Sequence, residues 1–285
     1  MKKDDIMIRP IQASDLQGAM RLSTEQGWNQ TEADWMRIIA PPQNISLLAE
    51  CHGKIIGTTA AMNYANKVAW INMVLVDKAY RRRGISKSLF ENILKELNFC
   101  KSIKLDATTE GQLVYRHFDF KEEYGISRVT AEVVHSLPPD TNEPVPIQSK
   151  DLKEVIDFDE SVFGANRTHL ITSMVSKYPD KARLLKQNNV ITGFALGRIG
   201  RKYDQIGPVM ASSASDAISL ITAALRKPLA KPLIADVLDD KTELRTWLNA
   251  VGFVQHRKFI RMYQHDNPFP GKITNHFLIG GPEYG

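Results

Sequence analysis

The sequence predicts a mixed α/β fold of two tandem domains, each a mostly antiparallel sheet flanked by helices. Three observations support this: an internal repeat, the order of strand and helix patterns, and a proline-rich segment between the halves. The pattern Ile-Gln-x-x-Asp-Leu occurs at 11–16 and again at 147–152, and Gly57 recurs as Gly193, an offset of 136 residues in both cases (147 − 11 and 193 − 57). A constant offset over separated landmarks indicates a duplicated domain.

The segment between the two halves has the composition of an extended connector. Residues 137–146 read LPPDTNEPVP and contain four prolines among polar residues. Such a composition favours an extended linker over a helix or a sheet strand. We therefore expect one domain over residues 1–137, a linker over 138–146 and a second domain over 147–285.

Strand and helix patterns alternate in a similar order in both halves. In the first half a helix begins near Ser14, where good N-capping residues stand, and another ends before Pro41-Pro42. The expected strands of this half are 6–12, 46–51, 54–64, 68–76, 102–106 and 124–135. The helix that ends before the two prolines covers 31–39, and the later helices are 84–97 and 109–117.

The second half repeats this order and fits the same kind of fold. Its expected elements are helix 151–160, a hairpin over 183–198, strand 205–211, helix 214–226, strand 232–238, helix 241–249 and strand 256–263. This order suggests an α/β sandwich and not a doubly wound dinucleotide fold.

Composition and charge exclude several classes of protein. An apolar content of 43% and a charged content of 24% are ordinary for a globular protein with a core. The best apolar run, VAWINMVLV at 68–76, is too short to cross a membrane, and the N-terminus lacks an apolar signal region. Two cysteines without a recognisable spacing suggest a reducing compartment, so we expect a cytoplasmic protein without a structural metal.

The most informative motif joins an apolar strand to a helix through three arginines. The strand ends at Val76, Arg81, Arg82 and Arg83 follow, and Gly84 opens the helix. The first N–H groups of a helix lack partners inside it, and the helix dipole favours an anion there. Glycine removes the Cβ that would stand between the backbone and a phosphate. The motif therefore predicts a diphosphate site.

Other interpretations of the arginines remain open at this point. They could form a solvated basic turn, or they could contact nucleic acid. A nucleic-acid surface predicts basic residues interleaved with aromatic ones, and the sequence offers a single basic cluster. The net charge of +5 fits an anionic ligand as well as nucleic acid, so it does not decide. We expect no nucleic-acid and no membrane partner.

Residues 81–86, Arg-x-x-Gly-x-Ser, resemble the acyl-CoA-binding motif Gln/Arg-x-x-Gly-x-Gly/Ala of the GNAT acetyltransferases. Arg81 and Gly84 match the motif, and Ser86 departs from it. The resemblance implies that acetyl-CoA binds here as the acyl donor. The residues implied in binding it are Val74, Val76, Arg81, Arg82, Arg83, Gly84, Ile85, Ser86 and Lys87.

A second stretch carries the same resemblance. The expected strand SIKLDA is followed by TTEGQLVYRHFDF, which is similar to the GNAT segment in which a tyrosine precedes a Gly-Phe corner. Tyr115 and Phe120 match, and Asp119 stands where glycine is usual. Asp tolerates left-handed turns better than most residues. The resemblance implies that Tyr115 protonates the departing CoA thiolate; alternatively, Tyr115 is a packing residue.

The base that deprotonates an amine acceptor is less clear from the sequence. An amine with a pKa of about 10.4 is mostly protonated at pH 7, so a base is useful. Many GNAT members carry a glutamate on the strand that here ends at Val76, but this strand offers only Asn72. Asp106 is the nearest alternative, and a water chain is another. Asp106 could instead cap the helix that starts near Thr108.

The second half lacks the anion site but carries its own resemblance. Its equivalent of the arginine loop is MASSASD at 210–216, and Leu248 takes the place of Tyr115. The half is similar to the C-terminal domain of a tandem GNAT subfamily, the acetyltransferase 18 type. The stretches of this half that carry the resemblance are VFGANR (162–167), IGPVMA (206–211), FIRMY (259–263) and FLIGGPEYG (277–285). GWNQTEADW (27–35) in the first half belongs to the same resemblance to the tandem subfamily.

The resemblance implies acetyl transfer from acetyl-CoA to an amine, without a metal. Trp28 and Asn29 fall in a loop that forms one wall of the acceptor pocket in GNAT folds, although Trp28 could equally pack in the core. We expect the second half to supply another wall, which favours a small-molecule amine. Arg167 could face the domain interface or form a surface ion pair. A non-catalytic acyl-CoA sensor is the alternative function, and both a monomer and a homodimer remain open.

Overall fold

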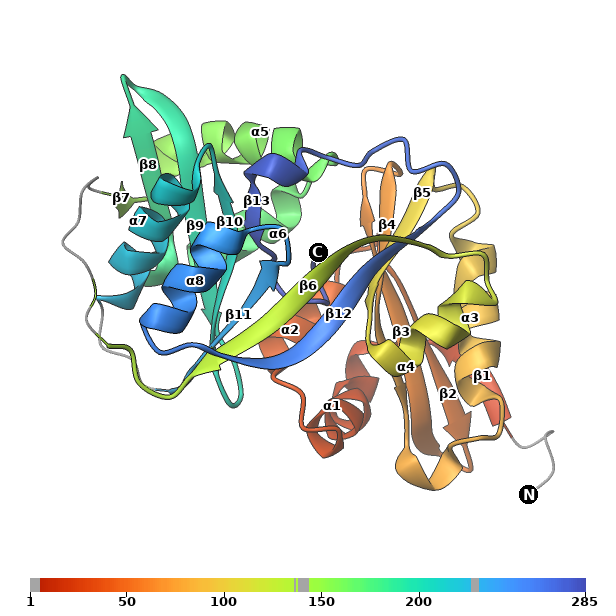
Figure 1. The fold of residues 1–285 in the computed structure, drawn as a ribbon. Helices are drawn as coiled ribbons and strands as arrows, with labels where there is room; N and C mark the ends of the chain where they lie inside the picture. The colour runs from red at the N-terminus through yellow and green to blue at the C-terminus, as the bar shows by residue number, and fades with distance from the viewer. Residues whose placement is uncertain (1–5, 136, 138–143, 227–230) are drawn as a thin grey trace.

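The structure is a computed structural model that describes residues 6–135, 137, 144–226 and 231–285. Within these ranges the strands form one continuous sheet, and helices cover both of its faces (Figure 1). The strand order is β1-β2-β3-β4-β5-β12-β6-β11-β13-β10-β9-β8-β7. In the same ranges no helix has the length and apolar character needed to cross a membrane.

The first half contains six strands and four α-helices in its described part. They are β1 (Ile6–Pro10), α1 (Leu16–Glu25), α2 (Glu32–Ile39), β2 (Ile45–Cys51), β3 (Lys54–Tyr64), β4 (Val68–Val76), α3 (Ile85–Glu96), β5 (Ser102–Ala107), α4 (Thr109–Arg116) and β6 (Lys121–Ala131). Each lies within a few residues of its predicted range, except that the last strand begins earlier and ends earlier than predicted.

The second half follows the same plan. Its elements are β7 (Val145–Pro146), α5 (Leu152–Phe163), α6 (Thr168–Lys177), β8 (Arg183–Gln187), β9 (Val190–Ile199), β10 (Asp204–Ala211), α7 (Ala214–Leu225), β11 (Leu233–Leu238), α8 (Thr242–Ala250), β12 (Val254–Gln264) and β13 (His276–Leu278). Helix α6 and the short strands β7 and β13 were not predicted. Most of the predicted linker, residues 138–143, lies outside the described residues.

The internal repeat is visible in the local geometry. Gln12 and Gln148 precede equivalent turns with nearly the same backbone angles, φ −107° and ψ 164° against φ −102° and ψ 163°. In both turns an aspartate three residues on, Asp15 or Asp151, accepts a hydrogen bond from the glutamine N–H. This reciprocal cap fixes the start of the first helix in each half.

The two halves exchange their long last strands. Strand β6 pairs with β11 of the second half, with Ala131 opposite Leu233 and Ile126 opposite Leu238. Strand β12 pairs with β5 of the first half, with Ile260 opposite Ala107. The two exchanged strands also pair with each other, and Figure 1 shows them as a long ribbon that crosses between the halves. The proposed boundary between residues 137 and 147 is therefore a boundary of the duplicated sequence unit, and neither unit completes its sheet alone.

A shared core reinforces this connection. One cluster of buried side chains contains Trp35 and Trp70 from the first half with Phe163 and Tyr284 from the second. Trp70 Nε1 donates a hydrogen bond to the carbonyl oxygen of Pro282 at 2.9 Å, and Tyr64 donates to that of Tyr284, also at 2.9 Å. The segment 279–285 thus lies between the halves, beside β4.

Candidate active site

The loop before α3 leaves the N-terminus of this helix open. Arg82 and Gly84 both have left-handed backbone angles, with φ of 61° and 76°. They turn the chain from β4 into the helix, which begins at Ile85 without a side-chain cap from Gly84. Unsatisfied N–H groups and the helix dipole therefore face an anion approaching this turn.

In the second half, the N-terminus of the equivalent helix, α7, is capped by a side chain. The hydroxyl of Ser213 accepts a hydrogen bond from Asp216 N at 3.1 Å and caps α7. Asp216 also places a carboxylate in the first turn. A side-chain cap and a negative charge both disfavour an anion, so the electrostatics of the two helix starts are opposite.

The residues predicted to bind the donor differ in the contacts and the exposure of their side chains around the loop before α3. Arg81 donates a hydrogen bond to Gln26 Oε1 at 2.7 Å, and the Arg83 guanidinium lies 5.2 Å from the centre of the Tyr80 ring. The Ile85 side chain is buried in the core, so only its main chain faces the turn. Lys87 is largely exposed, with Nζ 3.8 Å from a carboxylate oxygen of Glu91.

Strands β4 and β5 separate and open a gap in the sheet. The two parallel strands pair only over 68–70 and 102–104. Beyond this point β4 carries an irregularity: Met73 has φ 50°, and the register against β3 shifts there. Thr58 Oγ1 donates to the Met73 carbonyl oxygen at 2.8 Å and holds this bulge. The edge of β4 that faces β5 is therefore unpaired along 71–76.

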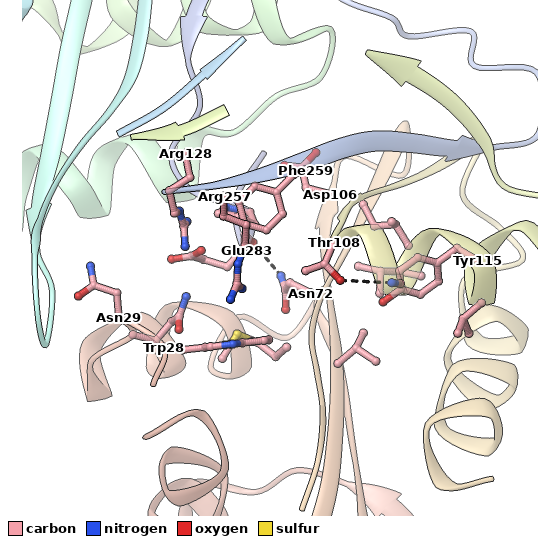
Figure 2. A pocket seen from close by; sticks show the side chains of 18 of the residues that line it. Trp28, Asn29, Asn72, Asp106, Thr108, Tyr115, Arg128, Arg257, Phe259 and Glu283 are labelled. Carbon is pink, nitrogen blue, oxygen red and sulfur yellow. Dashed lines mark hydrogen bonds between the residues drawn. The ribbon is translucent and has the colours of Figure 1, made fainter. Parts of the chain in front are cut away.

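A cavity of about 280 Å³ occupies this gap and extends between the halves. Figure 2 shows Tyr115 and Thr108 at one side of it, and Trp28, Arg128 and Glu283 at the other. The lining residues are Trp28, Asn29, Gln30, Ile71, Asn72, Met73, Val74, Ser86, Leu105, Asp106, Thr108, Gly111, Val114, Tyr115, Arg128, Arg257, Phe259, Pro282 and Glu283. One cavity thus connects the first turn of α3, through Ser86, with residues from both halves.

Tyr115 lies on the cavity wall and also packs against the core. Its ring centre is 5.0 Å from that of Phe90 and 6.1 Å from that of Phe120. Burial raises the pKa of the Tyr115 hydroxyl to about 12. The hydroxyl therefore carries its proton at neutral pH and can donate a hydrogen bond into the cavity. Asp119 has φ 59°, the left-handed conformation expected for it at the corner after α4.

The structure gives Asp106 a role different from either expected one. Arg261 Nε and Nη2 donate to its two carboxylate oxygens at 2.9 and 3.0 Å, and its side chain is fully buried. Helix α4 is capped by Thr108 instead, whose hydroxyl accepts from Gly111 N at 3.2 Å. Although burial raises the pKa of the Asp106 carboxyl, both oxygens are occupied. We therefore do not retain Asp106 as the catalytic base.

Asn29 connects the loop after α1 to the second half. Its Oδ1 accepts from Lys202 N at 2.8 Å and from Tyr203 N at 2.9 Å, and its Nδ2 donates to Tyr203 O at 3.1 Å. Arg201 Nη2 donates to the Trp28 carbonyl oxygen at 2.9 Å. These bonds hold the loop against the turn after β9, so Asn29 positions the Trp28 side chain in the cavity wall.

Sequence reasoning missed the contribution of the segment 279–285. Glu283 lines the cavity and is 2% exposed. Arg198 donates to Glu283 Oε1, and Asn72 Nδ2 donates to the Glu283 carbonyl oxygen at 2.8 Å. The stretch FLIGGPEYG resembles the tandem GNAT subfamily, but nothing in its sequence indicates that its glutamate reaches a cavity beside β4.

Two arginines on the exchanged strands also line the cavity. Arg128 on β6 and Arg257 on β12 lie directly opposite each other in the sheet. Arg128 Nε and Nη2 donate to Asp236 at 2.7 and 2.8 Å. Neither arginine was singled out in the sequence, because their proximity depends on the pairing of two strands 129 residues apart (257 − 128).

Arg167 lies at the interface, and the expected surface ion pair is wrong. The side chain is buried, and its Nη2 and Nε donate to Asp159 at 2.7 and 3.0 Å. Its Nη1 also donates to the carbonyl oxygen of Gly285 at 2.8 Å. Arg167 therefore helps to hold the segment that carries Glu283. Among the described residues, no group of three His, Cys, Asp or Glu side chains is placed to hold a metal ion.

Comparison with known proteins agrees with this architecture. Two models described as Acetyltransferase (GNAT) domain match the chain, one over residues 42–122 and the other over 155–278. The chain is 22% identical over 240 residues to an uncharacterized N-acetyltransferase, YitH, of Bacillus subtilis (strain 168), with 83% of each chain covered.

Solved structures share the fold over nearly the whole chain. A putative acetyltransferase from Pyrococcus horikoshii superposes with a TM-score of 0.83 at 21% identity, covering 100% of this chain and 98% of the other. A GCN5-related N-acetyltransferase from Sphaerobacter thermophilus gives a TM-score of 0.62 at 14% identity, with coverage of 93% and 96%. A tandem GNAT protein from the clavulanic acid biosynthesis pathway gives 0.63 at 10% identity, with coverage of 91% and 98%. The chain therefore belongs to the GNAT acetyltransferases and carries two GNAT domains in tandem.

Proposed function

We propose that this protein transfers an acetyl group from acetyl-CoA to the primary amine of a small molecule. The observation that carries the proposal is that one cavity connects the open start of α3 with a space lined by both halves. We call this space the chamber; its lining includes Trp28, Arg128 and Glu283. A donor that enters from the α3 side and an acceptor that enters from the chamber would meet beside β4. The family supports acyl transfer in general, and the cavity supports this division of roles.

The donor would bind to the first half alone. Its diphosphate lies at the N-terminus of α3, against Gly84 and the arginines at 81–83, where Ser86 and Lys87 follow in the first turn. Its pantetheine arm runs along the unpaired edge of β4, past Val76 and Val74, of which Val74 lines the cavity. The α7 start, closed by Ser213 and Asp216, is unsuited to this role.

The reaction is a direct transfer in one site. The acceptor nitrogen, once deprotonated, attacks the thioester carbon; the C–N bond forms, the C–S bond breaks, and the thiolate leaves. The nitrogen then gives up its second proton, which the thiolate takes up. Tyr115, with a pKa of about 12, donates a hydrogen bond to the departing sulfur. Complete proton transfer from Tyr115 to a thiolate of pKa about 8.5 would cost roughly 5 kcal/mol, so the hydrogen bond is its main contribution.

The experiment that tests the proposal measures thiol release. The protein is mixed with acetyl-CoA and a panel of primary amines, free CoA is detected with a thiol reagent, and products are identified by mass spectrometry. We expect amine-dependent thiol release and an N-acetyl product in equal amounts. Thiol release that does not depend on any amine, or acetyl-CoA left intact with all of them, would contradict acetyl transfer to a small amine.

One observation favours a second function, acyl-CoA binding without transfer. Strand β4 carries no carboxylate, and Asp106 is engaged by Arg261. A sensor would bind acetyl-CoA and stay unreactive with every amine, so calorimetric binding measured beside thiol release distinguishes the two functions.

We place the protein in the cytoplasm because Cys51 and Cys100 are both buried and form no disulfide.

A further inference from the structure

We infer that the acceptor is a small zwitterion whose primary ammonium is bound and deprotonated by Glu283, while its anionic group lies against Arg257. The inference rests on the proposed function and specifies the acceptor and the base of the same site. It assigns the chemistry of the chamber to the second half of the chain, because both residues come from there.

Three buried oxygen acceptors in the chamber lack a partner among the described residues. They are Glu283 Oε2, Asn72 Oδ1 and Gln30 Oε1, on side chains that line the cavity. The residues are 2%, 6% and 8% exposed. Buried polar atoms in proteins nearly always have a hydrogen-bond partner, so three unpartnered acceptors around one cavity favour a ligand that supplies donors. A primary ammonium carries three N–H donors and no acceptor.

Glu283 is held firmly enough to act at a defined position. Its main chain is fixed by hydrogen bonds from Asn72 and, through its neighbours, from Trp70 to Pro282 and from Tyr64 to Tyr284. Its Oε1 accepts from Arg198, which leaves Oε2 for the acceptor. A site whose groups are locked by packing and hydrogen bonds loses little free energy in ordering them.

The surroundings of Glu283 suit a proton acceptor. The charged groups that act on it are Arg198 from β9, Asp34 from α2 and Arg128 from β6. Arg257 from β12 lines the same cavity. Burial raises the pKa of the Glu283 carboxyl, and Arg198 partly opposes this effect. A carboxylate with a raised pKa is a stronger base than an exposed one. It removes one proton from the ammonium, and the neutral amine attacks the thioester as described above.

Arg257 is the residue that would bind the anionic group of the acceptor. Arg128 and Arg257 lie opposite each other on paired strands, an arrangement that repels. Asp236 neutralises Arg128 through two hydrogen bonds. Arg257 makes no ion pair within the described part of the chain, and the exposed carboxylate of Glu110 on α4 attracts it only from beyond ion-pair distance. Arg257 is exposed and lines the cavity. A carboxylate or phosphate on the acceptor would neutralise it, and Figure 2 shows Arg257 on the same side of the cavity as Glu283.

The test uses matched pairs of amines that differ only in the anionic group. Lysine is compared with cadaverine, phenylalanine with phenethylamine, and phosphoethanolamine with ethanolamine. We expect kcat/KM to be at least about tenfold higher for the anionic member of a productive pair, a difference of about 1.4 kcal/mol. In Arg257→Gln this preference should fall to about threefold or less. Lys258→Gln, a change at the next exposed residue of β12, is the control and should keep the preference.

A second variant tests the base. Glu283→Gln keeps an oxygen for Arg198 but cannot take a proton. We expect kcat to fall about 10²–10⁴-fold, with unchanged acetyl-CoA affinity by calorimetry. The residual rate should rise steadily with pH as the free amine becomes more abundant. Glu243→Gln, at an exposed position of α8, is the control and should behave as the native protein.

The outcomes separate this inference from the proposed function. Transfer only to amines without an anionic group, or only to peptide amines, would overturn the zwitterion and leave acetyl transfer standing. A native rate and pH profile in Glu283→Gln would overturn the base. Acetyl-CoA binding without transfer to any amine would overturn the inference and the proposed function, and it would leave the donor site in place.

Discussion

Substitution of Gly84 separates the backbone and charge contributions of the proposed diphosphate site. Gly84 has φ 76°, and a Cβ built on it meets no atom within 4 Å. A side chain therefore causes no overlap in the free protein, and its cost is backbone strain of roughly 1–2 kcal/mol. Asn tolerates this conformation better than other residues with side chains. Gly84→Asn thus measures the effect of a neutral side chain, and Gly84→Glu adds a negative charge at the same place.

The charge is the larger effect on binding. A carboxylate about 4 Å from each phosphate charge is repelled by about 1 kcal/mol per pair even in bulk water, and by more near a protein surface. Two such pairs give about 2 kcal/mol, or roughly a thirtyfold loss of affinity relative to Gly84→Asn. Displacement of the diphosphate by the longer side chain would add to this loss.

The assay is calorimetric titration of each variant with acetyl-CoA, at low and at moderate salt. Denaturant unfolding in parallel measures the strain, which should be similar for the two variants. The affinity gap between them should narrow with salt, because salt screens the repulsion. If Gly84→Glu binds acetyl-CoA within threefold of Gly84→Asn, the diphosphate does not lie at this helix start and the placement of the donor is wrong.

Three further predictions concern the residues around the cavity. Tyr115→Phe should lower kcat about 10–100-fold at unchanged acetyl-CoA affinity, the loss expected when a hydrogen bond to a charged sulfur is removed; more than half the native single-turnover rate would make Tyr115 a packing residue. Asp106→Asn should cost about 3–5 kcal/mol in denaturant unfolding, since it leaves Arg261 buried without its partner; a large rate loss at native stability would restore Asp106 as a base. A truncation near Pro139 should fail to give a native-like far-ultraviolet and near-ultraviolet spectrum, because β5 and β6 lose β12; a monomeric, cooperatively folding fragment would contradict this.

The sequence predicts local elements well because their signals are local. Strand β4 is an apolar run interrupted only by Asn72, and α3 begins directly after Gly84, the glycine expected to open the helix. The start of α1 is visible in a capping pattern that recurs 136 residues later. Helix α6 escaped because it begins after Arg167, which is not a capping residue, and no side chain caps its start.

The exchange of β6 and β12 could not be predicted, because pairing between distant strands leaves no local pattern. The pairing of Arg261 with Asp106 follows from the exchange, since the two lie opposite each other in the β5–β12 register. This explains why a carboxylate at a plausible position for a base serves instead to hold the two halves together.

The residues of the candidate site also divide into those that a local motif indicates and those that depend on contacts between distant segments. The α3 turn, Tyr115 and Trp28 were accessible from motifs, because each lies in a short stretch that resembles the family. Glu283, Gln30, Arg128 and Arg257 were not, because their roles depend on how the segment 279–285 and the exchanged strands meet the first half. Residues that act across an interface carry no signal in their own neighbourhood.

The central claim, that a donor held by the first half meets an amine in a chamber lined by both, is tested most directly by a single turnover. Excess protein is mixed with acetyl-CoA labelled in the acetyl group and a zwitterionic amine, and the label is followed into product by mass spectrometry. The account predicts one N-acetyl product per acetyl-CoA in the native protein, much slower product formation in Gly84→Glu at protein concentrations that saturate the native site, and a slow, pH-dependent yield in Glu283→Gln. Label that stays on bound acetyl-CoA in the native protein with every amine, or transfer at the native rate in both variants, would contradict it.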